Sequence, residues 1–258
     1  MSMSASTYLL LGSLPLLALS EWKSKSHTGT AVFKMLCSVA FLSSPLLLPS
    51  TDWSDYHRLI TIGLSFSLLG DFFLIPSRRE FYGLKEEELA SGGSIAERKV
   101  SVSFQIGIVA FAAAHVAYTL AFLRDSYKTS WIIFAATFLG TLGAARWLGV
   151  IYPQPSSSLW SNALGLDISL DMKVLVSFYA IIIGTMFAAA TSTTPLVAAD
   201  WSNSRALGAA MFVLSDLFVA KNAFGKSSAS NGRGLVEIFT GYGLYFWAQM
   251  VIANTVRI

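Results

Sequence analysis

The chain alternates between long apolar stretches and short polar segments. A helix of about 20 mostly apolar residues crosses the hydrocarbon core of a bilayer, and eight stretches approach or reach that length. We therefore predict an all-α fold, a polytopic membrane bundle of about eight transmembrane helices. Their expected bounds are 3–21, 30–48, 57–76, 102–123, 130–150, 172–191, 204–223 and 235–254.

Two of the connecting segments are long. Residues 77–101 are strongly polar and contain a Ser-Gly-Gly break, and residues 151–171 contain two prolines and a run of serines. No basic residue precedes the apolar run 8–19, so we interpret this run as a retained first helix rather than a signal peptide. The sequence predicts one integral-membrane helical domain over residues 1–258.

Composition agrees with a membrane protein and predicts its orientation. Hydrophobic residues make up 54% of the chain and charged residues only 13%, whereas soluble domains are about 25% charged. The net charge is +3 and most basic residues lie in predicted loops, so we expect no nucleic-acid partner. Cytosolic loops are enriched in Lys and Arg. Eleven basic residues fall on one side and five on the other, with Lys34 and Arg146 set aside, which predicts both termini outside the cytosol.

Two aspartates lie inside predicted transmembrane helices. Asp71 is in LSFSLLGDFFLIP and Asp216 is in AAMFVLSDLFVA. A charged side chain at the centre of a bilayer costs roughly 2.5–3.5 kcal/mol on insertion scales, and such residues usually face the interior of a bundle. The alternative to a functional role is a structural hydrogen bond to a neighbouring helix.

Lys34 lies four or five residues into the second predicted helix. At about 1.5 Å of rise per residue, its depth matches that of Asp71 and Asp216, in the cytosolic half of the bundle. We predict that the amine compensates the charge of a carboxylate at this level. A lysine that extends its amine to the headgroups is the alternative.

Other polar residues at membrane depth are candidates for the same site. His115 and Tyr118 are three residues apart, and Tyr245 and Gln249 four apart, so each pair shares a helix face. Tyr179 lies in the sixth predicted helix. A packing role is an equal alternative for each, because buried polar groups normally find hydrogen-bond partners.

A weak internal repeat relates the two halves of the chain. Residues 67–74 (SLLGDFFL) align with residues 212–219 (FVLSDLFV), and Phe111-x-x-x-His115 aligns with Tyr245-x-x-x-Gln249. A parallel repeat of four plus four helices would place the two aspartates in equivalent positions. Chance similarity between apolar strings is the alternative.

Five short motifs follow one another along the predicted helices. They are Val32-Phe33-Lys34; the run 63–71 ending at Asp71; the run 107–122 with Phe111, His115 and Tyr118; the run 208–216 with Phe212, Ser215 and Asp216; and Tyr245, Ala248 and Gln249. Together they resemble the YhhN family, the membrane lysoplasmalogenases. Met35 departs from the family pattern, which often has a proline after the lysine. The segments 77–101 and 151–171 look longer than a minimal member needs.

The resemblance implies hydrolysis of the vinyl ether bond of lysoplasmalogens, giving a fatty aldehyde and glycerophosphoethanolamine or glycerophosphocholine. Protonation of the vinyl ether requires a general acid, and capture of the resulting cation by water is helped by an ionised carboxylate. Asp71 and Asp216 are therefore the expected acid/base pair. Lys34, His115, Tyr118, Tyr179, Tyr245 and Gln249 are expected to bind substrate or to orient water, Lys34 by holding an aspartate ionised or by binding the lipid phosphate. The reaction needs no metal or redox cofactor.

Two other classes of protein fit the residues. Buried carboxylates also serve as proton relays in transporters, and repeats are common there, so a membrane transporter or lipid scramblase is the main alternative. A non-catalytic lipid-binding bundle is a third interpretation. The expected partners are a lysophospholipid substrate and membrane lipids, and the default location is the endoplasmic reticulum.

Overall fold

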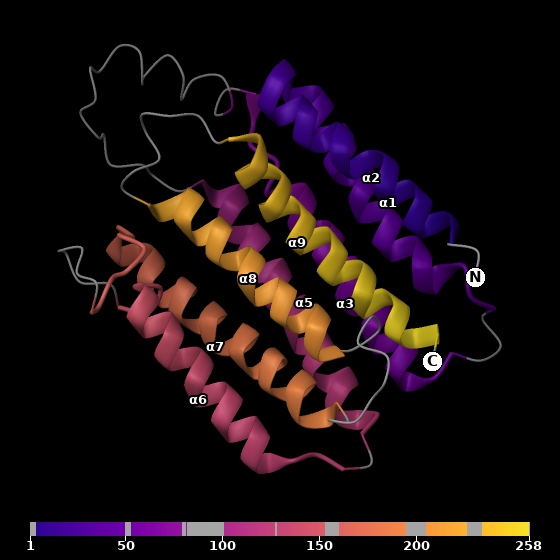
Figure 1. Ribbon diagram of the computed structural model, residues 1–258, viewed down its shortest axis with the longest axis vertical. Coiled ribbons are helices and arrows are strands. Elements are labelled where there is room, and N and C mark those ends of the chain that lie inside the picture. The colour runs from indigo at the N-terminus through magenta and orange to yellow at the C-terminus, as the bar shows by residue number, and fades with distance from the viewer. Residues whose placement is uncertain are drawn as a thin grey trace.

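The fold is helical throughout the part of the chain that the structure describes. The computed structural model describes residues 4–49, 53–78, 81, 101–126, 128–152, 160–194, 205–225 and 234–257 (Figure 1). These residues form eight α-helices, and each corresponds to one of the predicted helices. Their bounds are α1 Ala5–Leu19, α2 His27–Leu46, α3 Asp55–Phe73, α5 Val102–Arg124, α6 Trp131–Leu148, α7 Leu170–Thr193, α8 Arg205–Phe224 and α9 Leu235–Asn254. Short turns of π-helix (Ser20–Ser24) and 3-10 helix (Thr255–Arg257) follow α1 and α9.

Local side-chain chemistry explains where several helices begin and end. Ser4, Ser26, Ser54 and Ser101 precede α1, α2, α3 and α5, and each serine side chain accepts a hydrogen bond from the backbone N–H three residues on. This is the arrangement that stabilises the first turn of a helix. The predicted third helix was too long at its end, because Pro76 disfavours helical backbone at the residue before it, and α3 stops at Phe73.

Six of the described helices are long and apolar enough to cross a membrane: α2, α5, α6, α7, α8 and α9. The chain is therefore a multi-pass membrane protein. Neither α1 nor α3 meets this criterion of length and apolar composition. α1 has only 15 residues, and α3 contains the polar residues Asp55, His57, Arg58 and Asp71. Most of the long segment 77–101, and residues 153–159 of the segment 151–171, lie outside the described residues.

The helices pack as neighbouring pairs around one core. α3 packs along α5, α8 along α9, α1 along α2 and α6 along α7, and the contacts of α2 with α9 and of α5 with α7 join the two halves. α3 and α5 approach closely at Gly70, where an added Cβ would lie 2.6 Å from the Phe111 ring. Small residues allow such close approach of membrane helices.

α6 differs from the other helices because none of its side chains is buried. Figure 1 shows it at one edge of the bundle beside α7, with α1 and α2 at the opposite edge. Gly184 of α7 faces Phe138, Thr141 and Leu142 of α6, so this pair packs through a glycine. The free side of α6 lines a cavity that contains the candidate functional site.

Candidate functional site

Asp71 lies in the last turn of α3 and is 1% exposed. The Nζ atom of Lys34, from α2, is 3.5 Å from its Oδ1 atom. Its Oδ2 atom accepts hydrogen bonds from the hydroxyls of Ser38 and Tyr245, each at 2.7 Å. A buried ion pair is tolerated when further hydrogen bonds satisfy the charged atoms. Both carboxylate oxygens have a partner here, so the environment favours an ionised Asp71.

Asp216 lies in α8, is half-buried and has different partners. The hydroxyl of Tyr179, from α7, donates to Oδ2 of Asp216 at 2.6 Å. Nε2 of His115 is 3.1 Å from the same hydroxyl. With the phenolic hydrogen directed to Asp216, the His115 tautomer that fits this arrangement carries its hydrogen on Nε2 and donates to the phenolic oxygen. Nδ1 of His115 has no hydrogen-bond partner among the described residues.

The two carboxyl groups therefore differ in how their charge is compensated. Lys34 contacts Asp71, as predicted, but among the described residues no Lys or Arg forms an ion pair with Asp216. The carboxylate that Lys34 compensates is therefore that of Asp71. A carboxylate without a counter-charge at membrane depth is costly, so its surroundings favour a protonated Asp216.

Three further polar groups form a closed ring of hydrogen bonds behind this site. Tyr118 donates to Oε1 of Gln249 at 2.8 Å, and Nε2 of Gln249 donates to the hydroxyl of Ser67 at 2.9 Å. The Ser67 and Tyr118 oxygens are 3.2 Å apart, which completes the ring. Tyr118 thus bonds toward α3 and α9 rather than toward His115 on its own helix.

Both aspartates line one cavity of about 890 Å³. Lys34, Tyr179 and Tyr245 also line it, so the structure brings together five of the eight candidate residues. His115, Tyr118 and Gln249 are fully buried and lie behind its wall. On the side of Lys34 the wall includes the polar residues Glu21, Thr30 and Tyr242, and on the other side it consists mostly of apolar residues of α6, α7 and α8.

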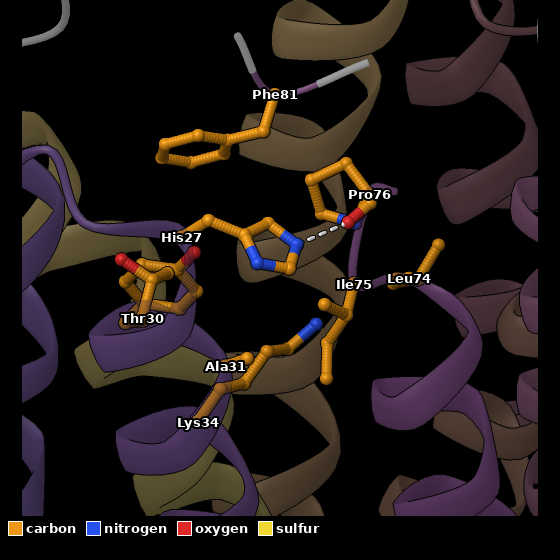
Figure 2. A pocket seen from close by; sticks show the side chains of 9 residues that line it. His27, Thr30, Ala31, Lys34, Leu74, Ile75, Pro76 and Phe81 are labelled. Carbon is orange, nitrogen blue, oxygen red and sulfur yellow. Dashed lines mark hydrogen bonds between the residues drawn. The ribbon is translucent and has the colours of Figure 1, made fainter. Parts of the chain in front are cut away.

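A small pocket of about 40 Å³ adjoins the polar side of this cavity. Figure 2 shows His27 directed at Pro76, with Nε2 of the histidine 2.6 Å from the proline carbonyl oxygen, and Lys34 beneath it. The pocket shares Thr30, Lys34 and Tyr242 with the large cavity. Lys34 therefore stands between the large cavity and the end of the bundle where α2 begins.

Sequence analysis missed two serines of the site. Ser38 lies four residues after Lys34, and Ser67 lies four residues before Asp71. Residues four apart on a helix share a face, so this spacing is the signal that identifies both. Serine is common in membrane helices without a functional partner, so the four-residue spacing alone does not distinguish these two serines from the others.

An aromatic cluster stands between the two aspartates. The Phe212 ring centroid is 4.5 Å from that of His115 and 5.4 Å from that of Tyr245. Phe111 is 5.8 Å from Tyr245 and lines the cavity. These ring contacts connect Tyr245, which bonds to Asp71, with His115, which bonds to Tyr179. The rings near the aspartates offer electron-rich faces.

The fold and the site define a multi-pass helical membrane protein with two carboxyl groups at membrane depth, one buried and one half-buried, on one cavity. Residues 29–256 match the YhhN family, and the chain belongs to it. The match includes every candidate residue and confirms the resemblance drawn from the five motifs. No curated protein and no solved structure matches the chain.

Proposed function

We propose that the protein is a membrane hydrolase that cleaves the vinyl ether bond of lysoplasmalogens. The observation that carries the proposal is the pairing of two differently compensated aspartates on one cavity. Family membership adds support, since the resemblance implies this reaction class. The products are a fatty aldehyde and a glycerophosphoethanolamine or glycerophosphocholine.

The difference between the aspartates assigns their roles in the proposed reaction. Asp216, which faces no cation among the described residues, is the general acid and transfers its proton to the β-carbon of the vinyl ether. Asp71, held ionised by Lys34 at 3.5 Å, stabilises the oxocarbenium ion. A pair of carboxyl groups in unlike environments divides acid and base roles in the same manner in glycosidases.

Water then completes the reaction without a net gain or loss of protons. Asp71 accepts a proton as water adds to the cationic carbon, giving a hemiacetal. The carboxylate of Asp216 accepts the proton of the hemiacetal hydroxyl, and Asp71 returns its proton to the ether oxygen as the carbon–oxygen bond breaks. The aldehyde and the alcohol leave, and both aspartates regain their starting states.

Tyr179 and Lys34 act as supporting groups in this proposal. The hydrogen bond from Tyr179 to Asp216 orients the acid toward the cavity. The ion pair of Lys34 with Asp71 favours the first of its two expected roles, which is to keep the carboxylate ionised rather than to bind phosphate. Phe111 offers its ring to the developing cation.

The cavity matches an amphipathic lipid with a single chain. Polar groups from α2, α3 and α9 line one side of the cavity, and mostly apolar groups from α6, α7 and α8 line the other. Both aspartates line this same cavity. Ligand pockets of about 300–1,000 Å³ enclose most of a drug-sized molecule. A volume of about 890 Å³ is therefore ample for a headgroup and part of one chain.

The test is aldehyde release by the purified protein in detergent with a lysoplasmalogen as substrate. Asp71→Asn and Asp216→Asn keep the side-chain volume and remove the acid/base chemistry, and each is expected to abolish aldehyde release. Asp55→Asn is the matched control, because Asp55 lies in α3 like Asp71 but its side chain is 81% exposed. Full activity of both site variants, with elution on gel filtration unchanged, would falsify the assignment.

The same assay separates the hydrolase from the transporter alternative. A hydrolase releases aldehyde in detergent, where no gradient exists, whereas a transporter does not. Movement of lipid or protons across sealed vesicles without aldehyde release in detergent would instead favour the transporter or scramblase.

We further propose that the bundle has eight membrane crossings and arose from two parallel repeats of four helices. Lys34 contacts Asp71, Tyr179 contacts Asp216, and 37 residues separate the members of each pair. The glycine approaches also correspond. A Cβ at Gly63 would collide with the Tyr118 ring, and a Cβ at Gly208 would lie 2.8 Å from Ile252. Gly63 corresponds to Gly208 in the alignment that pairs Asp71 with Asp216, and Tyr118 corresponds to Ile252 in the alignment that pairs Phe111 with Tyr245.

A further inference from the structure

The part of the cavity away from Lys34 is bounded by α6, α7 and α8. Along α6 its lining residues are Thr137, Gly140, Thr141, Ala144, Ala145 and Leu148. Residues three or four apart on a helix share a face, so one stripe of α6 faces the cavity. Ile183 and Phe187 of α7 and Val213 and Leu217 of α8 also line this part, and none of these four side chains carries a polar group.

This apolar part of the cavity reaches the outer surface of the bundle. Gly140 and Ala144 of α6 line the cavity and are nevertheless exposed, and Leu214 and Val219 of α8 line it with 50% and 41% exposure. α6 packs along α7 and buries no side chain, so its cavity-facing flank is not covered by another helix. Within a membrane, such an opening between apolar helices faces lipid chains rather than water.

Gly140 is a position on the α6 wall of the cavity that leaves room for a larger side chain. A Cβ atom added there would meet no atom within 4 Å. A larger side chain at this position therefore occupies cavity volume without displacing protein. Gly143, three residues further along the same helix, also has no atom within 4 Å of an added Cβ, but it does not line the cavity.

We propose that the space between α6, α7 and α8 seats the hydrocarbon chain of the lipid substrate, admitted sideways from the bilayer, and that Gly140 determines which chains fit. The occupant is one lipid chain because this space is continuous with the aspartates at its polar end and is lined mostly by apolar side chains beyond them. The inference rests on the proposed function for the identity of the lipid. It adds the location of the chain and a residue that sets chain preference.

The matched variants are Gly140→Leu and Gly143→Leu. Both replace an exposed helical glycine of α6 and raise helix propensity equally, so a general effect on α6 is the same in both. We measure kcat/KM for a short-chain and a long-chain lysoplasmalogen. One methylene in an apolar pocket is worth about 10-fold or more in discrimination. Gly140→Leu is therefore expected to lower the long-to-short ratio by at least about 10-fold, and Gly143→Leu to leave it within about twofold of the wild-type ratio.

A binding measurement makes the test independent of hydrolysis. Saturated-ether analogues of the two lipids cannot be cleaved, and a bound ligand raises the melting temperature by mass action. The long-chain analogue is expected to stabilise the wild type and Gly143→Leu more than Gly140→Leu. Ala144→Leu, on the same face as Gly140, is a second variant with the same expectation, for use where Gly140→Leu yields no folded protein.

The outcomes separate this inference from the proposed function. If the wild type releases no aldehyde but the Gly140 variant alone loses long-chain stabilisation, the hydrolase assignment fails and the chain seat stands. If aldehyde is released but the Gly140 and Gly143 variants share one chain-length profile in both measurements, the function stands and the chain seat is wrong.

Discussion

At the scale of single residues, the ion pair of Lys34 and Asp71 explains how a charged carboxylate is kept at membrane depth. Both side chains are buried, and Asp71 has two additional hydroxyl donors. Removal of one partner from a buried pair costs about 3–5 kcal/mol because it leaves an uncompensated charge, whereas removal of both together is far less costly.

This asymmetry predicts the behaviour of a double variant. Lys34→Met is expected to lower the melting temperature in detergent substantially, and the double variant Lys34→Met with Asp71→Asn is expected to recover most of that loss. Neither variant is expected to release aldehyde, because Asp71 loses its charge or its counter-ion in each. A double variant no more stable than Lys34→Met alone would contradict the assigned ion pair.

The chain from His115 through Tyr179 to Asp216 makes a second prediction at this scale. Tyr179→Phe removes the hydrogen bond that Asp216 accepts from α7. Asp216 becomes charged as it gives up its proton, and a hydrogen bond to a charged group is worth about 1.5–3 kcal/mol. We expect kcat to fall by about 10- to 100-fold with KM little changed. His115→Phe is expected to lower kcat less, since His115 lies behind the cavity wall and acts through Tyr179.

The positioning role of His115 is checked by combining the two changes. Among the described residues, the hydrogen bonds that link His115 to Asp216 pass through Tyr179. The double variant is therefore expected to have the kcat of Tyr179→Phe alone. Residues that act through one contact are non-additive in this way, and independent residues are additive. Multiplicative losses in kcat would mean that His115 affects the reaction by another route.

Part of this site follows from the sequence and part does not. The depth argument predicted that Lys34 compensates one of the two aspartates, because equal distances along helices of known rise place residues at equal levels. It did not choose between them, and the structure pairs Lys34 with Asp71. It did not predict that Tyr179 donates a hydrogen bond to Asp216, or that Tyr118 bonds to Ser67 and Gln249. Depth along the axis can be counted from sequence, but the rotation of a helix about its axis depends on packing.

At the scale of helices, the sequence predicted which helices exist better than it predicted how deeply each one is buried in the bundle. Each of the eight predicted helices is present among the described residues, since apolar runs of this length have few alternatives in a membrane. The special position of α6 was not predicted, because its apolar content resembles that of buried helices while none of its side chains is buried. Among the described helices, α6 packs mainly along α7. Which neighbours a helix has is a property of the assembled bundle and cannot be counted from its own sequence.

Helix contacts also show why the glycines of this chain are unequal. Gly63 and Gly70 of α3 lie against the rings of Tyr118 and Phe111 and permit the close packing of α3 on α5. Gly140 and Gly143 of α6 have no such neighbours. In the first case glycine brings two helices together, and in the second, at Gly140, it leaves a cavity open. The same residue type thus serves structure in one half of the bundle and the candidate binding space in the other.

At the scale of the whole molecule, α1 begins and α9 ends at the same end of the bundle (Figure 1). An even number of crossings produces this arrangement, and the distribution of Lys and Arg predicts that this end is outside the cytosol. Lys34 and Asp71 lie nearer the opposite end, so the polar side of the cavity is expected to face the cytosol.

Single cysteines labelled in sealed vesicles of known orientation test this arrangement. Cys37 is buried and is first replaced by serine, and a cysteine is then introduced at Lys25 or at Lys128. Lys25 follows α1 and Lys128 follows α5, with α2, α3 and α5 between them. If all three of these helices cross, as eight crossings require, the two positions lie on opposite sides of the membrane. A membrane-impermeant maleimide is expected to label Lys25→Cys only from the cytosolic side and Lys128→Cys only from the other. Labelling of both from one side would rule out eight crossings, and the polar mouth of the cavity would then lose its assigned side.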